Sequence, residues 1–376
     1  MLLLVLTAQL QLLFSGTVAD PLIDKLIEKG VIESYEAQEI RKEITHVIKK
    51  QLDEEKSKED AKKKEDGEKL KISGYLQTLY KWSEGSAALL SILRARASFS
   101  RKFTDFLSFS VTPDFAKLSE DKNVELKGVY IDYTPFADYL SFRIGQFNQP
   151  FGFENVYSSS WKKFLDAPRY LKEVLISDYD YGVQVSAGYK EMLRVHAAVL
   201  NGTTKATETN DKKDLALKAT SDLRFIHYLF SGVEVGISVY ERYYSTATMV
   251  AVMKGKHFGT YLKVERDIVI PVFLTLEYVC GKDYKIRHDV IDCIGTLEIK
   301  PFALTKSKYL EGLSPVFRYE LWDKDMKVSN DEEAIISCGI NYYFDKFLRV
   351  LMECRSSRTS NKPATETYSL MVQVNF

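Results

Sequence analysis

The sequence predicts an all-β protein: a 16-stranded antiparallel transmembrane β-barrel preceded by a short N-terminal helical or coiled-coil segment. From Lys71 to Phe376, apolar and polar residues alternate with the period of two that is typical of strands between lipid and water. The alternating runs are even in number, and short connections between them alternate with long ones. The 23 Tyr and 21 Phe, beside only 3 Trp, suit a protein that lines two membrane interfaces.

The chain before the barrel divides into three predicted parts. Residues 1–19 are apolar and end in small residues before Asp20, which predicts a signal peptide for export. Residues 20–52 repeat apolar side chains at three- and four-residue spacing, which predicts a periplasmic amphipathic helical segment. Residues 53–70 form a charged linker, in which the first seventeen positions hold no apolar residue larger than alanine. The period then switches to two, so residues 71–376 are the barrel domain.

The strands follow from cutting the alternation at turn residues and charge clusters. They are predicted near 71–82, 88–101, 104–116, 124–134, 138–147, 180–190, 192–201, 213–223, 231–245, 255–266, 270–282, 288–300, 313–322, 333–344, 347–356 and 365–376. Tight turns are expected at Lys102-Phe103 and Asp345-Lys346, while the long turn around 301–312 fits the alternation least well. The last strand is the clearest, with Tyr368, Leu370, Val372, Val374 and Phe376 on the face predicted to contact lipid. A soluble β-sandwich is the competing interpretation.

The composition excludes some functions. The 52 basic and 52 acidic side chains cancel and form no dense basic patch, so no nucleic-acid partner is expected. The sequence holds no G-x-S-x-G or H-E-x-x-H motif, so we expect neither an enzyme nor a cofactor or metal. The four cysteines are interpreted mainly as small apolar residues, although Cys280 and Cys293 could meet across a hairpin and form a disulfide.

The longest irregular stretch, residues 148–179, is predicted to be the third outer loop. It contains Phe151, Phe153, Trp161 and Phe164, more large apolar groups than a solvated loop carries. Packing against the barrel wall would bury them, and an inward fold would place the polar groups of the loop in the lumen. The alternative is a loop that caps the barrel or packs against a neighbouring subunit.

Candidate anion ligands lie within that loop. Ser158, Ser159, Lys162, Lys163 and Arg169 offer hydroxyls and cations that can replace part of an anion's hydration by charge-assisted hydrogen bonds. A run of charges is otherwise a solvated face, so the sequence leaves open which of these side chains face the lumen.

A second basic feature lies in the second strand. Arg94 and Arg96 are two residues apart and share a face, while the opposite face is apolar. They are predicted to face the lumen, because a charge against lipid at the midplane costs about 2–4 kcal/mol. They either form an ion ladder or pair with Asp114 and Asp132 to brace the wall.

Several segments together resemble one known family. They are Leu93-Arg94-Ala95-Arg96, residues 109–116, Ile131-Asp132-Tyr133 and above all residues 143–154, which reads RIGQFNQPFGFE. These resemble the phosphate-selective porin O/P family over about residues 71–376, most strongly between 90 and 190. The resemblance implies a homotrimeric porin in the outer membrane of a Gram-negative-type envelope, with outer-membrane lipid around it and a basic pore constricted by the third loop.

The resemblance also implies which residues contact the anion. In phosphate-specific members, an arginine pair in strand two and a serine pair with a lysine in the third loop do so. Arg94 and Arg96 match the strand motif, although Leu93 stands where a further arginine is common. Ser158 and Ser159 match the serine pair, whereas Ser160 stands in place of the lysine, with Lys162 and Lys163 nearby.

The expected function is therefore passive diffusion of small anions, including phosphate or polyphosphate. Two alternatives stay open: a general non-selective porin, or a structural outer-membrane anchor whose residues 20–66 contact the cell wall or a periplasmic partner.

Overall fold

The structure is a computed structural model. It describes residues 69–376 with gaps at 119–122, 137–138, 176–178, 191, 203–210, 228–230, 245–252, 267–269, 283–287, 306 and 361, together with residues 28, 29, 33, 35 and 36. The chain divides into two compact units, residues 1–69 and Leu70–Phe376. The predicted signal peptide 1–19, helical segment 20–52 and linker 53–70 lie almost entirely outside the described residues and stay predictions. No helix within the described ranges is long and apolar enough to cross a membrane.

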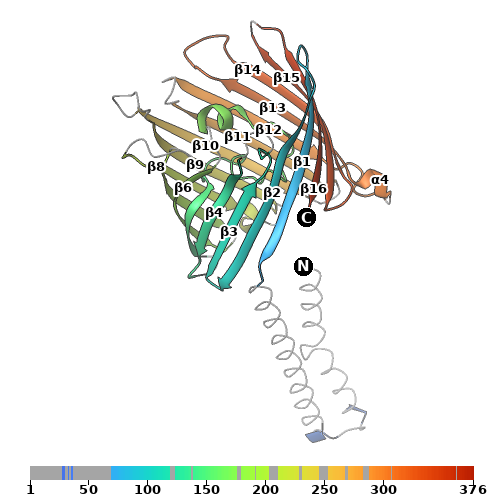
Figure 1. Ribbon diagram of the computed structural model, residues 1–376. Coiled ribbons are helices and arrows are strands. Elements are labelled where there is room, and N and C mark those ends of the chain that lie inside the picture. Colours follow the sequence, from blue (N-terminus) through green and yellow to red (C-terminus); the bar gives the residue numbers. More distant parts are fainter. Residues whose placement is uncertain are drawn as a thin grey trace. The chain divides into compact units, whose positions relative to one another are not determined.

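Sixteen strands form a closed antiparallel barrel (Figure 1), which confirms the predicted fold class. The strands are β1 (Lys71–Ser83), β2 (Leu89–Thr104), β3 (Leu107–Asp114), β4 (Glu125–Tyr133), β5 (Leu140–Asn148), β6 (Tyr179–Tyr189), β7 (Leu193–Leu200), β8 (Asp214–Asp222), β9 (Val233–Tyr244), β10 (Met253–Arg266), β11 (Val272–Lys282), β12 (Asp289–Ile299), β13 (Leu313–Asp323), β14 (Glu333–Tyr343), β15 (Leu348–Thr359) and β16 (Thr365–Asn375). Each strand pairs with its neighbours in the sequence, and β1 pairs with β16 to close the ring.

The strand β16 shows why the alternating sequence folds in this way. The side chains of Val372 and Val374 point outward and are 37% and 44% exposed, whereas Met371 and Gln373 point inward and are 1% exposed. The barrel closes at Gly74, whose backbone exchanges hydrogen bonds of 2.9 and 3.0 Å with Phe376. A Cβ atom at Gly74 would lie only 2.3 Å from the backbone carbonyl oxygen of Arg96 in the neighbouring strand β2, so the closure favours glycine there.

One predicted turn is wrong. The strand β2 continues to Thr104, so the turn to β3 lies at Asp105 and Phe106 rather than at Lys102-Phe103. The register shifts between Lys102 and Thr104, which leaves Phe103 as an extra residue in the hairpin. The Phe103 ring stacks on Phe109 with centroids 5.5 Å apart, and this contact favours the longer hairpin.

Two other predictions concern the second half of the barrel. The long turn 301–312 links β12 to β13 and contains the short helix α4 (Lys308–Glu311). The cysteines are free: Cys280 pairs in register with Ile291, and Cys293 pairs with Tyr278. Cys280 and Cys293 are therefore diagonal rather than directly opposite, and the disulfide considered from the sequence is not formed.

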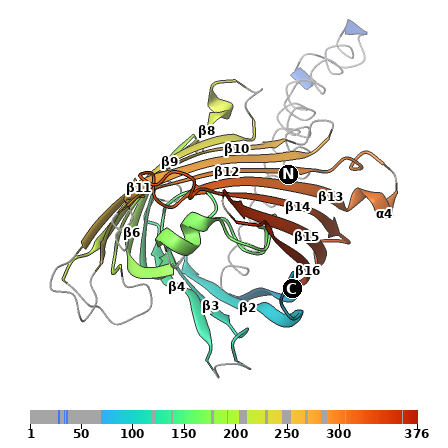
Figure 2. The same cartoon turned by 90° about the horizontal axis from the view of Figure 1, so that it is seen from above.

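The third loop, residues 148–179, connects β5 to β6 and lies inside the ring of strands. Figure 2 shows its helical turn η1 (Leu171–Leu175) surrounded by the barrel. Phe151, Phe153 and Phe164 are buried, as the inward fold requires, whereas Trp161 remains 59% exposed. The apolar core of the barrel forms where this loop meets inward side chains of the wall, such as Tyr240.

Candidate functional site

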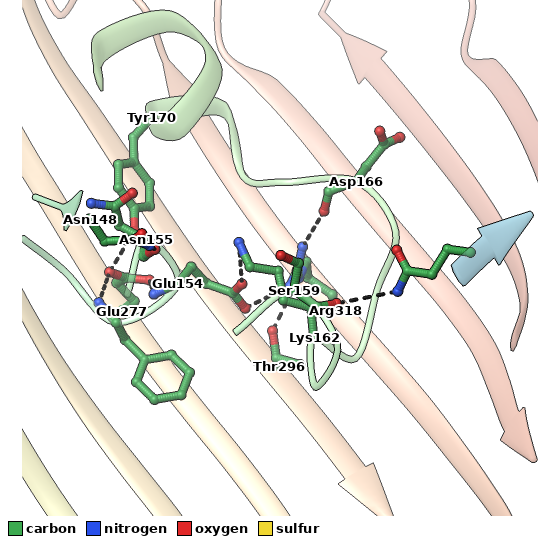
Figure 3. Close-up of polar contacts among 12 residues, drawn as sticks. Asn148, Glu154, Asn155, Ser159, Lys162, Asp166, Tyr170, Glu277, Thr296 and Arg318 are labelled. Carbon is green, nitrogen blue, oxygen red and sulfur yellow. Dashed lines mark hydrogen bonds and ion pairs between the residues drawn. The ribbon is translucent and has the colours of Figure 1, made fainter. Parts of the chain in front are cut away.

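Buried carboxylates from the barrel wall hold the third loop through its backbone. The amide N–H groups of Phe153, Leu165, Arg169 and Tyr170 donate to Glu277, Glu353, Glu320 and Asp292 at 2.6, 3.0, 2.5 and 3.0 Å. These four acceptors lie in β11, β15, β13 and β12, respectively, on one side of the barrel wall. The Tyr170 hydroxyl also donates to Glu277 at 2.9 Å (Figure 3). The contacts satisfy amides that would otherwise be buried without partners.

Two buried arginines complete the attachment of the loop to this half of the wall. Figure 3 shows the Arg318 guanidinium between Glu154, the Asp166 carbonyl and Thr296, at 2.8, 2.9 and 3.1 Å. Arg349 donates to the carbonyl of Lys162 at 2.8 Å. The loop is thus fixed against strands β11 to β15, and Ser238 and Arg242 of β9 bind its backbone as well. The open space lies on its other side.

That space is a cavity of about 410 Å³ between the loop and strands β1 to β8. We call it the basic passage, because five Lys or Arg side chains line it: Arg96, Lys127, Arg143, Lys162 and Lys218. His196 also lines it, and among the described residues of its lining there is no Asp or Glu. Hydroxyl and amide groups from both the wall and the loop lie between the cations, so an anion meets positive charge and hydrogen-bond donors together.

Arg96 joins the wall to the tip of the loop. Its Nε donates to Asp114 at 2.7 Å, and its Nη1 donates to the Ser159 hydroxyl at 2.8 Å. The Tyr75 hydroxyl donates to the same Ser159 oxygen at 3.2 Å. Because two donors already point at this oxygen, the Ser159 hydroxyl is arranged to donate its own hydrogen. Of the two alternatives that the sequence left open for Arg96, the ion pair with Asp114 is present.

The structure brings four of the seven predicted site residues together: Arg96, Ser158, Ser159 and Lys162 all line the basic passage. Lys162 faces it with Glu154 3.9 Å away. Asp132, which the sequence offered as one alternative partner for the strand-two arginines, instead holds Arg143 through two hydrogen bonds of 2.7 and 2.9 Å.

The other three predicted residues lie elsewhere. Arg94 donates to Gln77 at 2.7 Å and is not part of the lining. Lys163 forms an ion pair of 2.5 Å with Glu298, and burial lowers its pKa although Glu298 opposes this. Arg169 pairs with Glu333 at 2.5 Å and lines a second cavity of about 390 Å³. Carboxylates hold Lys163 and Arg169, an amide oxygen accepts from Arg94, and none of the three lines the basic passage.

Three cations of the passage were missed in the sequence: Lys127, Arg143 and Lys218. Arg143 and Lys218 occupy inward positions of the alternating pattern, and that signal could have found them. The alternation does not identify Lys127, because it breaks at Gly128, where φ is +76° and the register between β3 and β4 shifts. Lys218, for example, lies beside the outward-facing Leu217, which is 49% exposed. Its Nζ donates to the Gly152 carbonyl at 2.7 Å, and it forms no ion pair within the described part of the chain.

Comparisons with known proteins agree with this architecture. Residues 74–265, just over half of the chain, match the family described as phosphate-selective porin O and P. The fold is similar to the anion-selective porin from Comamonas acidovorans, with a TM-score of 0.62, 8% identity, and coverage of 82% of this chain and 99% of that one. It is also similar to OmpF of Salmonella typhi, with a TM-score of 0.58, 12% identity, and coverage of 83% and 99%.

A third similar structure is the trimer form of OmpT from Vibrio cholerae, with a TM-score of 0.57, 11% identity, and coverage of 82% and 99%. No curated protein matches the sequence. At such low identities, these structures establish the fold alone. Together with the family match over residues 74–265, the closed barrel places the protein in the outer membrane, and the chain belongs to the phosphate-selective porin O and P family.

Proposed function

We propose that this porin is a channel for passive diffusion of small anions, with phosphate among them. The observation that carries the proposal is the lining of the basic passage, in which five Lys or Arg side chains and His196 occur without any Asp or Glu among the described lining residues. The similar barrel from Comamonas acidovorans is an anion-selective porin, which supports the proposed preference for anions.

The carboxylates near these cations do not cancel their effect in the passage. Four of the five cations have an acidic partner that is not part of the passage lining. These pairs are Arg96 with Asp114 and Arg143 with Asp132 at 2.7 Å, Lys127 with Glu125 at 3.0 Å, and Lys162 with Glu154 at 3.9 Å. An ion in the passage is therefore closer to the cations than to the carboxylates, and Coulomb energies fall with distance. Lys218 adds a charge that has no ion-pair partner among the described residues. Anions are attracted and cations repelled.

Phosphate is included because the passage brings together donors of the right kind. Arg96 and Lys162 supply charge, and Ser158 and Ser159 supply hydroxyls in the same lining. Oxygen-rich anions accept several such charge-assisted hydrogen bonds at once. This arrangement supports phosphate as one of the transported anions, without requiring that the channel reject the others.

The experiment that tests this proposal measures single-channel chloride conductance of the purified protein while phosphate is added. We expect phosphate to reduce the chloride current in a saturable way, because both anions use the basic passage. A Lys162→Gln/Arg96→Gln variant should be blocked less. A channel whose chloride current ignores phosphate would refute the phosphate part, and a cation-preferring channel would refute the whole proposal. Equal permeability to both ions would establish the general non-selective porin instead.

An enzymatic function is not favoured by the lumen. Ser186 and His196 are hydrogen bonded at 2.8 Å, which resembles the first two members of a hydrolase triad. However, Gln184 approaches the same Nδ1 atom of His196 at 3.4 Å, and the described contacts include no carboxylate on the ring. The acid that orients the histidine in such enzymes is therefore not among its described partners.

We also propose that the porin is a homotrimer. The strands β3, β4 and β5 form a short wall with 8, 9 and 9 residues per strand, and β7 and β8 are as short, with 8 and 9 residues. At the usual rise and tilt these strands span only about 21–23 Å, less than the apolar band of about 25 Å. Ile131 and Ile144 on their outer face are 50% and 57% exposed. A second copy of the chain would cover this short wall, and the mass of the purified protein in mild detergent tests it.

A further inference from the structure

The basic passage contains aromatic rings as well as charges. Tyr75, Tyr130, Tyr157, Tyr179 and Phe147 all belong to its lining, and they come from four strands and the third loop. The four tyrosines are half-buried, so part of each ring is accessible. Inorganic phosphate has no apolar surface and makes no use of such rings. Their presence needs a reason beyond attraction of a small inorganic anion.

The rings and the cations are arranged in pairs. The Arg143 guanidinium lies 3.9 Å from the centroid of the Tyr130 ring, a close stacking distance. Lys127 lies 5.3 Å from the Tyr179 ring, and Arg96 lies 5.8 Å from the Tyr75 ring. All six side chains line the same cavity. Each cation is thus next to a flat apolar surface inside the channel.

Such a pair recognises a particular kind of ligand. The cation binds an anionic group, while the neighbouring tyrosine ring or the planar guanidinium offers a face for stacking. The ligand that uses both is an aromatic ring with a carboxylate or phosphate attached. The space is sufficient, because an apolar cavity of about 150 Å³ already holds benzene and the basic passage measures about 410 Å³.

We infer that the passage prefers small aromatic anions, in which a carboxylate or phosphate is attached directly to a ring, over inorganic anions of the same charge. The inference rests on the proposed anion channel and names the substrate class that its lining fits best. The ionic group contacts Arg143, Lys127 or Arg96, and the ring stacks on Tyr130, Tyr179 or Tyr75. Passage along the channel then consists of moving from one cation and ring pair to the next.

The experiment compares phenyl phosphate with methyl phosphate as blockers of the chloride current through the full-length channel in a planar bilayer. Both carry the same charged group, so the ratio of their half-blocking concentrations isolates the ring. Aromatic pairs contribute enough for phenyl phosphate to block at about threefold to tenfold lower concentration. Neutral phenol should not block, which excludes an effect of ring partition into the lipid.

Variants assign the preference to the tyrosines. A Tyr130→Leu/Tyr179→Leu variant removes two of the three pairs and should lower the ratio while chloride still passes. The Tyr130→Phe/Tyr179→Phe variant keeps the rings and should keep the ratio, and it tests the inference even if the leucine variant fails to assemble. Tyr133→Leu is the matched control, because Tyr133 is 45% exposed on the outer face.

The outcomes separate this inference from the proposed function. An anion-selective channel that methyl and phenyl phosphate block equally would overturn the preference for aromatic anions and leave the anion channel intact. A channel that prefers cations would overturn both. A preference that persists unchanged in the leucine variant, with normal chloride current, would show that these rings do not carry it.

Discussion

Lys218 offers the sharpest test of how charge in the basic passage selects ions. Its Nζ is held by the Gly152 carbonyl at 2.7 Å and forms no ion pair within the described residues. A Lys218→Gln variant removes the charge, while its amide can still donate to Gly152 and keep the loop in place. The outward-facing Lys256→Gln, at an exposed position of β10, is the matched control.

The size of the effect follows from Coulomb's law. An ion that passes about 6 Å from a unit charge in a water-filled pore gains or loses about 0.7 kcal/mol. Loss of Lys218 weakens anion attraction and cation repulsion together, so the permeability ratio changes by about 1.4 kcal/mol, or tenfold. Most of this change remains in about 0.01 M salt, where the Debye length is about 30 Å, and it falls below about twofold in about 1 M salt.

The assay measures the zero-current potential across a bilayer in a potassium chloride gradient, at low and at high mean salt. We expect the anion to cation permeability ratio of Lys218→Gln to fall by up to about tenfold at low salt only. Lys256→Gln should behave as the unmodified protein. A ratio that does not change at low salt, or that changes equally at both salt concentrations, would refute the electrostatic reasoning.

Three further predictions concern the loop and the assembly. Arg318→Met removes the partner of the buried Glu154, which should weaken the attachment of the loop by about 3 kcal/mol. The mean conductance and the current noise of the channel should rise. Unchanged single-channel traces would contradict this prediction. Burial raises the pKa of Asp166, but Lys172, Arg355 and Lys81 outweigh it and lower the pKa to about 2. The stability that this carboxylate contributes is complete above about pH 4 and is lost as the pH falls through about 2. The difference in thermal stability between the protein and Asp166→Asn should therefore disappear over that range. A difference that has already disappeared at pH 5 would exclude the ion pairs as its source. Ile144→Asp places a charge on the short wall and should convert trimers to monomers in mild detergent, whereas persistence of trimers would place the interface elsewhere.

The alternation of residues was enough to predict the barrel, because one face of every strand meets lipid and the other meets the lumen. The bounds of β1 and β16 agree with the prediction within one residue. The turn after β2 was misplaced because the stacking of Phe103 on Phe109 extends the hairpin, and a local alternation does not report such a contact.

The candidate site was predictable only in part, for a physical reason. Lys162 and Lys163 are neighbours in a loop without periodic structure, so the sequence could not show that one faces the passage and the other binds Glu298. Lys218, by contrast, occupies an inward strand position that the same alternation identifies, whereas the alternation breaks at Gly128 beside Lys127. The pairing of each cation with a tyrosine ring depends on contacts between strands, which only the folded barrel brings together.

The zero-current potential of the unmodified channel tests the central claim most directly. With a tenfold gradient of potassium chloride across a planar bilayer, at low mean salt, the basic passage predicts a potential of the sign that chloride permeation produces. Its magnitude should shrink as the salt concentration rises, since screening weakens the field of the lining cations. A potential of the opposite sign, set by potassium, would contradict the account.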